Sequence, residues 1–130
     1  MNLVVDASAV LAILLGEEDA EVYLTILEAA DQVWISPVNW WEVQVRFREK
    51  AGAAGVANAE EWAKDLRISV EPVSFNHAKL AAAAFARYRG RPARLNLGDC
   101  FAYALAQDKR VALLYKGNDF TQTDVERHSI

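Results

Sequence analysis

The stretch Asn2-Leu3-Val4-Val5-Asp6-Ala7-Ser8-Ala9-Val10-Leu11-Ala12-Ile13-Leu14-Leu15-Gly16 decides the fold. Its short apolar run over residues 2–5, bounded by Asp6, predicts a buried strand. Asp6 or Ser8 can then cap a helix over residues 9–15, which Gly16 ends. A buried strand that leads at once into a helix is typical of a parallel α/β domain.

The rest of the chain continues this alternation. In the expected strand over residues 69–73, Pro72 favours a position at the sheet edge or at the end of the strand. Gly52–Gly55 is the most flexible candidate loop. Strands separated by helices pair in parallel through right-handed crossovers. The pattern therefore predicts one three-layer α/β/α domain over residues 1–130 with a mostly parallel central sheet. The remaining expected strands cover 33–35, 69–73 and 111–114, and the remaining expected helices cover 18–30, 38–52, 58–66, 74–88 and 96–106.

Composition limits the possible settings. The apolar fraction of 53% excludes intrinsic disorder. No apolar stretch reaches the ~20 residues of a membrane span, and Asp6 stands where a signal peptide would carry positive charge. Cys100 is the single cysteine, which suits a reducing compartment, so we expect a cytoplasmic protein without membrane association. The net charge of −4 argues against a generic polyanion binder.

Four acidic residues lie far apart in the chain but at equivalent places in the expected fold. Asp6 ends the first strand, Glu42 lies near the start of a helix, Asp99 opens another helix, and Asp119 follows the last strand. In parallel sheets, ligands bind outside the carboxyl ends of the strands. The sequence therefore predicts that these four carboxylates share one rim.

Each acid also has a purely structural explanation. Asp6 can cap a helix, Glu42 can face solvent, Asp99 can stabilise a helix terminus, and Asp119 can initiate a turn. Their joint placement favours function. Two carboxylates about 4 Å apart repel by roughly 4 kcal/mol at an effective dielectric of ~20, so the cluster needs raised pKa values or a bound divalent cation. A cation at such a rim suggests chemistry on a phosphate ester.

The histidine, cysteine and tryptophan residues receive structural interpretations. We expect His77, in the first turn of its helix, to be a surface or boundary residue, and His128, near the terminus, to be exposed. Neither has a partner at metal-ligand spacing, which argues against a histidine-based metal site. Cys100 is expected to be a small core residue, since a nucleophile would need an activating base. Trp40 and Trp41 could stack on bases, but we expect both to pack.

Four blocks of the chain, in this order, resemble the PIN-domain ribonucleases, and most of all the VapC-type toxins of bacterial toxin–antitoxin pairs. The resemblance covers the chain from Asn2 to Val125. The blocks are Val4-Val5-Asp6-Ala7-Ser8-Ala9, Asn39-Trp40-Trp41-Glu42-Val43, Leu97-Gly98-Asp99-Cys100-Phe101-Ala102-Tyr103-Ala104-Leu105-Ala106 and Leu113-Leu114-Tyr115-Lys116-Gly117-Asn118-Asp119-Phe120-Thr121-Gln122-Thr123-Asp124.

The resemblance implies an endoribonuclease that depends on Mg²⁺ or Mn²⁺. Its catalytic residues would be Asp6, Glu42, Asp99 and Asp119, with Asp6 and Asp99 as direct metal ligands. Ser8 matches a hydroxyl position near the site. One departure is Asn118, where many relatives carry another acid beside the last one, and Asp124 is a possible substitute.

The resemblance also implies partners. A cognate antitoxin would hold the toxin inactive, and homodimerisation is expected. The chain shows no helix-turn-helix or basic recognition helix, so we expect DNA binding to come from the antitoxin. Arginines at 87, 89, 91 and 94 precede Asp99, and we expect Arg91 and Arg94 to hold RNA phosphates, although a solvated loop is the alternative.

Two other phosphoryl-transfer classes remain as alternatives at this point. A receiver-like domain also has strand-end acids and a late lysine, here Lys116. It would carry an acidic pair at the first strand and a phosphoacceptor aspartate after a central strand, and this chain has neither. A haloacid-dehalogenase-like phosphatase would want an aspartate where Ser8 stands.

Overall fold

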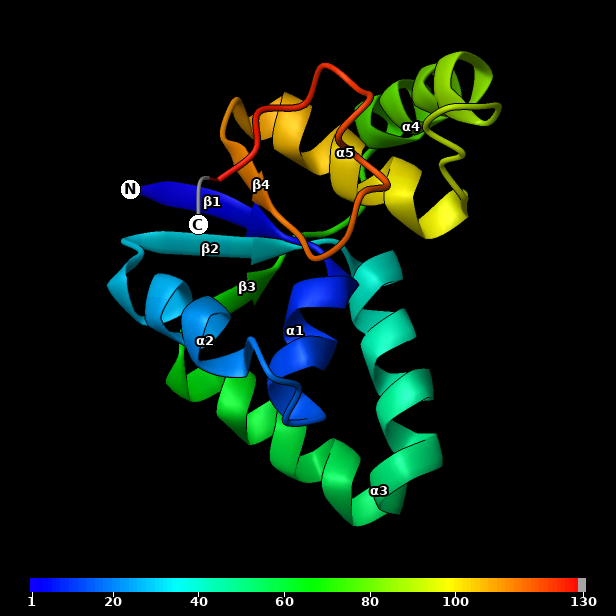
Figure 1. Cartoon of the computed structure of the whole chain (residues 1–130). Coiled ribbons are helices and arrows are strands. Elements are labelled where there is room, and N and C mark those ends of the chain that lie inside the picture. The colour runs from blue at the N-terminus through cyan, green and yellow to red at the C-terminus, as the bar shows by residue number, and fades with distance from the viewer. Residues whose placement is uncertain (129–130) are drawn as a thin grey trace.

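The structure, a computed structural model, describes residues 1–128 (Figure 1). Within these residues strands and helices alternate along the chain, as the sequence predicts. In order they are β1 (Asn2–Val5), α1 (Ala7–Leu14), α2 (Ala20–Ala29), β2 (Gln32–Ile35), α3 (Pro37–Asp65), β3 (Ile68–Val70), α4 (Phe75–Tyr88), α5 (Leu97–Lys109) and β4 (Ala112–Leu114).

The four strands form one sheet in the order β3-β2-β1-β4, and every pairing is parallel. Leu3 of β1 aligns with Val33 of β2 on one side and with Ala112 of β4 on the other. The chain builds outward from β1 to β3 and then returns to place β4 on the opposite side of β1. The strand order therefore reverses between β1 and β4, which is where ligands bind in open parallel sheets.

Helices cover both faces of the sheet, which confirms the three-layer α/β/α arrangement. In Figure 1, α1, α2 and α3 lie on one side of the sheet and α4 and α5 on the other. Alternate residues of β1 serve the two layers, because successive strand side chains point to opposite faces. Leu3 and Val5 belong to the core under α1 and α3, whereas Val4 belongs to the core under α4 and α5.

The C-terminal segment returns to the sheet after β4. The backbone N–H of Leu113 donates to Glu126 O at 2.8 Å, and that of His128 donates to Leu113 O at 3.1 Å. This parallel bridge covers the outer edge of β4. It also closes the loop that carries Asp119, so that loop is anchored at both ends.

The long helical element α3 contains the two expected helices, joined by a kink at Gly52. The expected loop over Gly52–Gly55 is wrong: only Gly52 leaves helical geometry, with φ 69° and ψ −173°. Its missing side chain permits this conformation, and the helix resumes at once with Ala53 and Ala54, which have high helix propensity. Asn58, expected to cap a new helix, lies inside α3.

The other boundaries shift by a few residues. The expected strand over 69–73 is shorter in the structure, because β3 ends at Val70, before Pro72. It lies at the sheet edge, as Pro72 suggested. The expected caps Ser74 and Asn96 are both present, each in a reciprocal capping box. Among the described helices, none has the length and apolarity needed to cross a bilayer.

Candidate active site

The four predicted acids gather at the carboxyl edge of the sheet, and we call them the acidic centre. Asp6 follows β1, Asp119 lies in the loop after β4, Glu42 lies near the start of α3, and Asp99 lies in the first turn of α5. Their charges act on one another: Glu42 and Asp119 raise the pKa of Asp6, and Asp6, Asp119 and Glu42 raise the pKa of Asp99.

Asp6 is fixed by both its backbone and its side chain. Its backbone N–H donates to Leu114 O at 2.9 Å, which extends the β1–β4 ladder by one bond. Its carboxylate caps α1, because Oδ2 accepts the Ser8 backbone N–H at 3.1 Å. The residue is only 5% exposed. Burial raises its pKa to about 6, against the opposing hydrogen bonds from Ser8.

Asp99 is held by the capping box that the sequence predicted for α5. Its Oδ2 accepts the Asn96 backbone N–H at 3.0 Å, and its own N–H donates to Asn96 Oδ1 at 2.9 Å. It is 8% exposed, and burial raises its pKa to about 7, although the Asn96 hydrogen bond lowers it. Asp6 and Asp99 thus hold protons at a pH where ordinary carboxyls are ionised.

Glu42 and Asp119 are more accessible members of the centre. Glu42 is half-buried, and burial raises its pKa while a hydrogen bond from Asn39 and the charge of Arg46 lower it. Asp119 is exposed on its loop. Neighbouring Asn118 is also exposed, and its carbonyl accepts hydrogen bonds from Thr121.

Asp124 belongs to a different cluster. Its Oδ1 accepts hydrogen bonds from the hydroxyls of Tyr88 at 3.1 Å and Tyr103 at 2.5 Å. Arg87 lies 3.6 Å from its other oxygen. The structure therefore gives no support to Asp124 as a substitute acid.

Ser8 connects the acidic centre to the loop after β4. Its hydroxyl oxygen accepts the Lys116 backbone N–H at 2.9 Å. The Lys116 ammonium turns to Glu17 and Asp19, each at 3.0 Å. The Lys116 ammonium is therefore paired with acids of the segment between α1 and α2. A receiver-like domain would give its late lysine a different role.

The four arginines before α5 divide into two pairs. Arg87 forms the ion pair with Asp124, and the Arg89 guanidinium lies 5.8 Å from the centre of the Phe85 ring. Arg91 and Arg94 are exposed, and no acid among the described residues pairs with them. The two residues predicted to hold phosphates are thus the two that remain available.

The donor set suits a hard divalent cation. Among the described residues, no group of three or more His, Cys, Asp or Glu side chains is arranged to hold one metal ion. Mg²⁺ does not require such a group, since it commonly uses one or two carboxylates and keeps several waters or substrate phosphates. Asp6 and Asp99 each have a single Oδ2 bonded to a backbone N–H, which leaves a second oxygen on each as a potential ligand.

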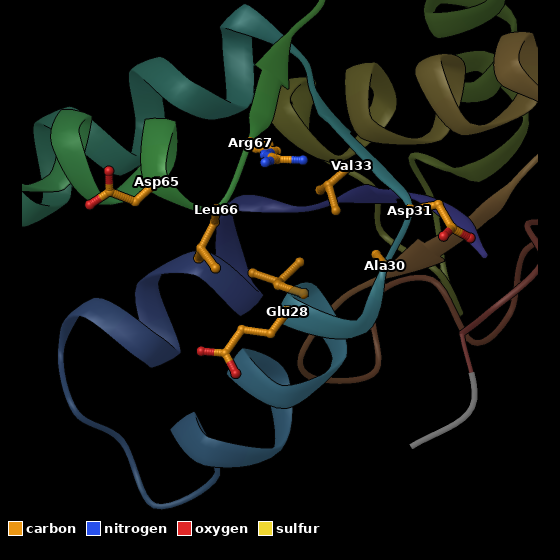
Figure 2. A pocket seen from close by; sticks show the side chains of 8 residues that line it. Glu28, Ala30, Asp31, Val33, Asp65, Leu66 and Arg67 are labelled. Carbon is orange, nitrogen blue, oxygen red and sulfur yellow. The ribbon is translucent and has the colours of Figure 1, made fainter.

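A cavity of about 450 Å³ lies away from the acidic centre, at the end of the sheet where strands β2 and β3 begin (Figure 2). It is formed where α2 leads into β2 and where α3 leads into β3. No member of the acidic centre lines it. The lining residues are Leu27, Glu28, Ala30, Asp31, Val33, Asp65, Leu66 and Arg67.

Several structural interpretations from the sequence need correction. His77 is 5% exposed and not at the surface, because its Nδ1 accepts the Ser74 backbone N–H and its Nε2 lies 2.8 Å from Asp108. Trp40 packs partly against the core, but Trp41 is 62% exposed, so only one of the pair packs. Cys100 is buried as expected, and burial raises its pKa to about 11.

Comparisons with known proteins agree with this geometry. Residues 3–126 match the PIN domain. Ribonuclease VapC28 from Mycobacterium tuberculosis is 41% identical over 128 residues, with 96% of each chain covered. The structure of the Sarcin-Ricin loop cleaving toxin VapC20, from the same organism, has a TM-score of 0.81 at 16% identity and covers 97% of this chain and 98% of that chain. VapBC2 from Rickettsia felis, bound to a promoter DNA fragment, has a TM-score of 0.75 at 13% identity, with 98% and 96% covered.

The fold and the site define a parallel α/β/α domain with an acidic centre at the point where the strand order reverses. The chain belongs to the PIN-domain family and, within it, to the VapC-type ribonucleases. This relationship confirms the resemblance seen in the sequence, and it rules out the receiver-like and phosphatase-like alternatives.

Proposed function

We propose that this protein is a divalent-cation-dependent endoribonuclease and the toxin of a type II toxin–antitoxin pair. The observation that carries the proposal is the pair of buried carboxyls, Asp6 and Asp99, whose pKa values are raised to about 6 and about 7. Burying two neighbouring acids is costly unless a cation compensates. Relatives named VapC ribonucleases, matched over 96% of the chain, support RNA as the substrate.

In this proposal ionised Asp6 and Asp99 would hold Mg²⁺ or Mn²⁺. When bound, the cation would supply Lewis-acid polarisation of the phosphate and would make the attacking water more acidic. Glu42 or Asp119 orients the attacking water by accepting a hydrogen bond from it. As the new oxygen–phosphorus bond forms, the attacking water gives up a proton to solvent. The bond to the 3′ oxygen breaks, and that oxygen takes up a proton from solvent.

The substrate is held mainly through its phosphates. Exposed Arg91 and Arg94 lie on the segment that leads into α5, the helix that carries Asp99. Guanidinium groups hold phosphates without reading sequence. They would also offset the negative field of the acidic centre, which a protein of net charge −4 needs in order to bind RNA.

The antitoxin is proposed to act at the same acidic centre. An antitoxin partner is supported by the similar fold of a chain in a toxin–antitoxin complex from Klebsiella pneumoniae. An arginine of the antitoxin can bind two carboxylates bidentately and so replace the cation. We further propose that the toxin forms a homodimer and acts in the cytoplasm, with DNA binding left to the antitoxin.

The test of this proposal is RNA cleavage by the purified protein with and without divalent cations. We expect cleavage with Mg²⁺ or Mn²⁺, loss of cleavage in excess chelator, and recovery when the cation is restored. Cleavage that continues unchanged in excess chelator would overturn the metal-dependent mechanism. A small reading frame for an antitoxin directly upstream of the gene would support the biological role.

A further inference from the structure

Asn39 connects two members of the acidic centre that belong to different helices. It lies in the first turn of α3 and is fully buried. Its side-chain Nδ2 donates to Glu42 Oε1 at 2.9 Å and to the backbone carbonyl of Gly98 at 2.9 Å. Gly98 directly precedes Asp99 in the first turn of α5. One amide group therefore joins Glu42 to the helix start that carries Asp99.

The chemistry of the neighbours fixes the orientation of this amide. A carboxylate and a carbonyl can only accept hydrogen bonds, so the nitrogen of Asn39, and not its oxygen, must face them. The opposite orientation would bring three oxygens together. The Oδ1 atom is then buried, without a hydrogen-bond partner among the described residues. Leaving a buried acceptor unpaired costs about 1–3 kcal/mol, a cost that an apolar residue filling the same space would avoid.

Gly98 completes the arrangement from the side of α5. A Cβ at position 98 would clash with the Glu42 carboxylate, that is, with both of its oxygens and with its carboxyl carbon. Gly98 is itself buried. The backbone of Gly98 is not in the left-handed region, so its conformation does not require glycine. The position requires glycine because the Glu42 carboxylate approaches it closely.

We propose that Asn39 and Gly98 form a seat that fixes the Glu42 carboxylate against the start of α5, beside Asp99. Asn39 is then a positioning residue for RNA cleavage, and this role rests on the proposed function. Its amide occupies Oε1 of Glu42, while Oε2 accepts no hydrogen bond from the described residues. The seat thus presents one defined oxygen of Glu42 to the substrate and its water.

Kinetics test whether Asn39 acts through Glu42. We expect Asn39→Ala to lower kcat by about 10- to 100-fold, as is usual for residues that orient a catalytic group, with KM unchanged because RNA contacts remain. Gly98→Ala should do the same from the opposite helix. In a Glu42→Ala background, Asn39→Ala should change kcat by less than about twofold, because the pair acts as a unit. Asn58→Ala, an exposed asparagine of α3, is the control and should leave kcat unchanged.

A full kcat in Asn39→Ala, or an equal loss with and without Glu42, would overturn the positioning role. A wild-type protein that does not cleave RNA would instead overturn the proposed function. The seat itself has a readout that needs no activity. In NMR spectra of the metal-free protein, we expect slow exchange of the Asn39 side-chain amide protons, and Glu42→Ala should move one of the two resonances. Fast exchange in the wild type, or no movement in Glu42→Ala, would show that the seat does not exist.

Discussion

The hydroxyl of Ser8 accepts a hydrogen bond from the backbone N–H of Lys116 at 2.9 Å, across 108 positions of the sequence. Ser8 begins the helix that Asp6 caps, and Lys116 begins the loop that carries Asp119. This single contact therefore sets the position of one member of the acidic centre relative to another.

Removing the Ser8 hydroxyl should make the position of the Asp119 loop relative to Asp6 less well defined. We expect Ser8→Ala to lower kcat by about tenfold, because a misplaced catalytic group costs far more in rate than in stability. The unfolding free energy should fall by about 1 kcal/mol, the usual value of one hydrogen bond. Steady-state kinetics and urea denaturation measure the two effects. Thr25→Ala, on the exposed side of α2, serves as the control. A wild-type kcat in Ser8→Ala would show that the contact does not matter for the site.

The raised pKa values make the stability of the metal-free protein depend on pH. Asp6 and Asp99 hold protons up to about pH 6 and about pH 7 in the folded state, whereas unfolded aspartates release theirs near pH 4. The folded state binds more protons in that window, so its stability falls as the pH rises from about 4 to 7.

Asparagine at either position should remove part of this dependence. We expect Asp99→Asn to be more stable than the wild type at pH 8 in chelator, by up to about 3 kcal/mol, and similar to it at pH 4. Urea denaturation across the pH range measures the difference. Asp65→Asn, at the exposed end of α3, should leave the slope unchanged. If the unfolding free energy of Asp99→Asn depends on pH as steeply as that of the wild type, the surroundings of Asp99 do not destabilise its ionised form.

The sequence predicted the parts of the site that depend on local structure. Asp6 follows an apolar strand directly, and Asn96 with Asp99 forms a capping box within four residues, so both placements are visible in short segments. Placing these segments on one rim required only the rule that parallel strands end at the same edge. The family resemblance then assigned them a chemistry.

The missed features depend on contacts between distant segments. Asn39 gains its role from the Gly98 carbonyl, 59 positions away, and the buried His77 pairs with Asp108, 31 positions away. Neither partner is visible in local periodicity. Trp41 remains exposed because its neighbour Trp40 takes the core-facing direction of the helix. Gly52 turns the chain alone, where the sequence suggested a longer loop.

The exposed arginines before α5 should contribute to RNA affinity through charge. We expect Arg91→Ala and Arg94→Ala each to weaken RNA binding and to reduce the salt slope by about one unit, the effect of losing one phosphate contact. Cation binding should be unchanged. Lys64→Ala, an exposed cation near the end of α3, controls for net charge. If both arginine variants keep the affinity and the salt slope of the wild type, the RNA is held elsewhere.

Inhibition by the antitoxin should depend on the acidic centre. An antitoxin arginine that binds Asp6 and Asp99 loses its partner in the Asp6→Ala, Asp99→Ala double variant, so we expect antitoxin affinity to fall by at least tenfold. High Mg²⁺ should also weaken the wild-type complex by competition. Affinities measured by calorimetry test both effects. Equal binding to the wild type and to the double variant would place the inhibitory contact on a remote surface.

The roles of Asp6 and Asp99 are tested by the single-turnover rate of RNA cleavage at saturating Mg²⁺ in Asp6→Asn and Asp99→Asn. A carboxylate-held cation that supplies about 4 kcal/mol to the transition state corresponds to about a thousandfold in rate. We therefore predict at least that loss in each variant, with the fold retained and with Asp65→Asn as active as the wild type. Cleavage at the wild-type rate by either Asp6→Asn or Asp99→Asn would show that these two buried carboxylates do not carry the reaction.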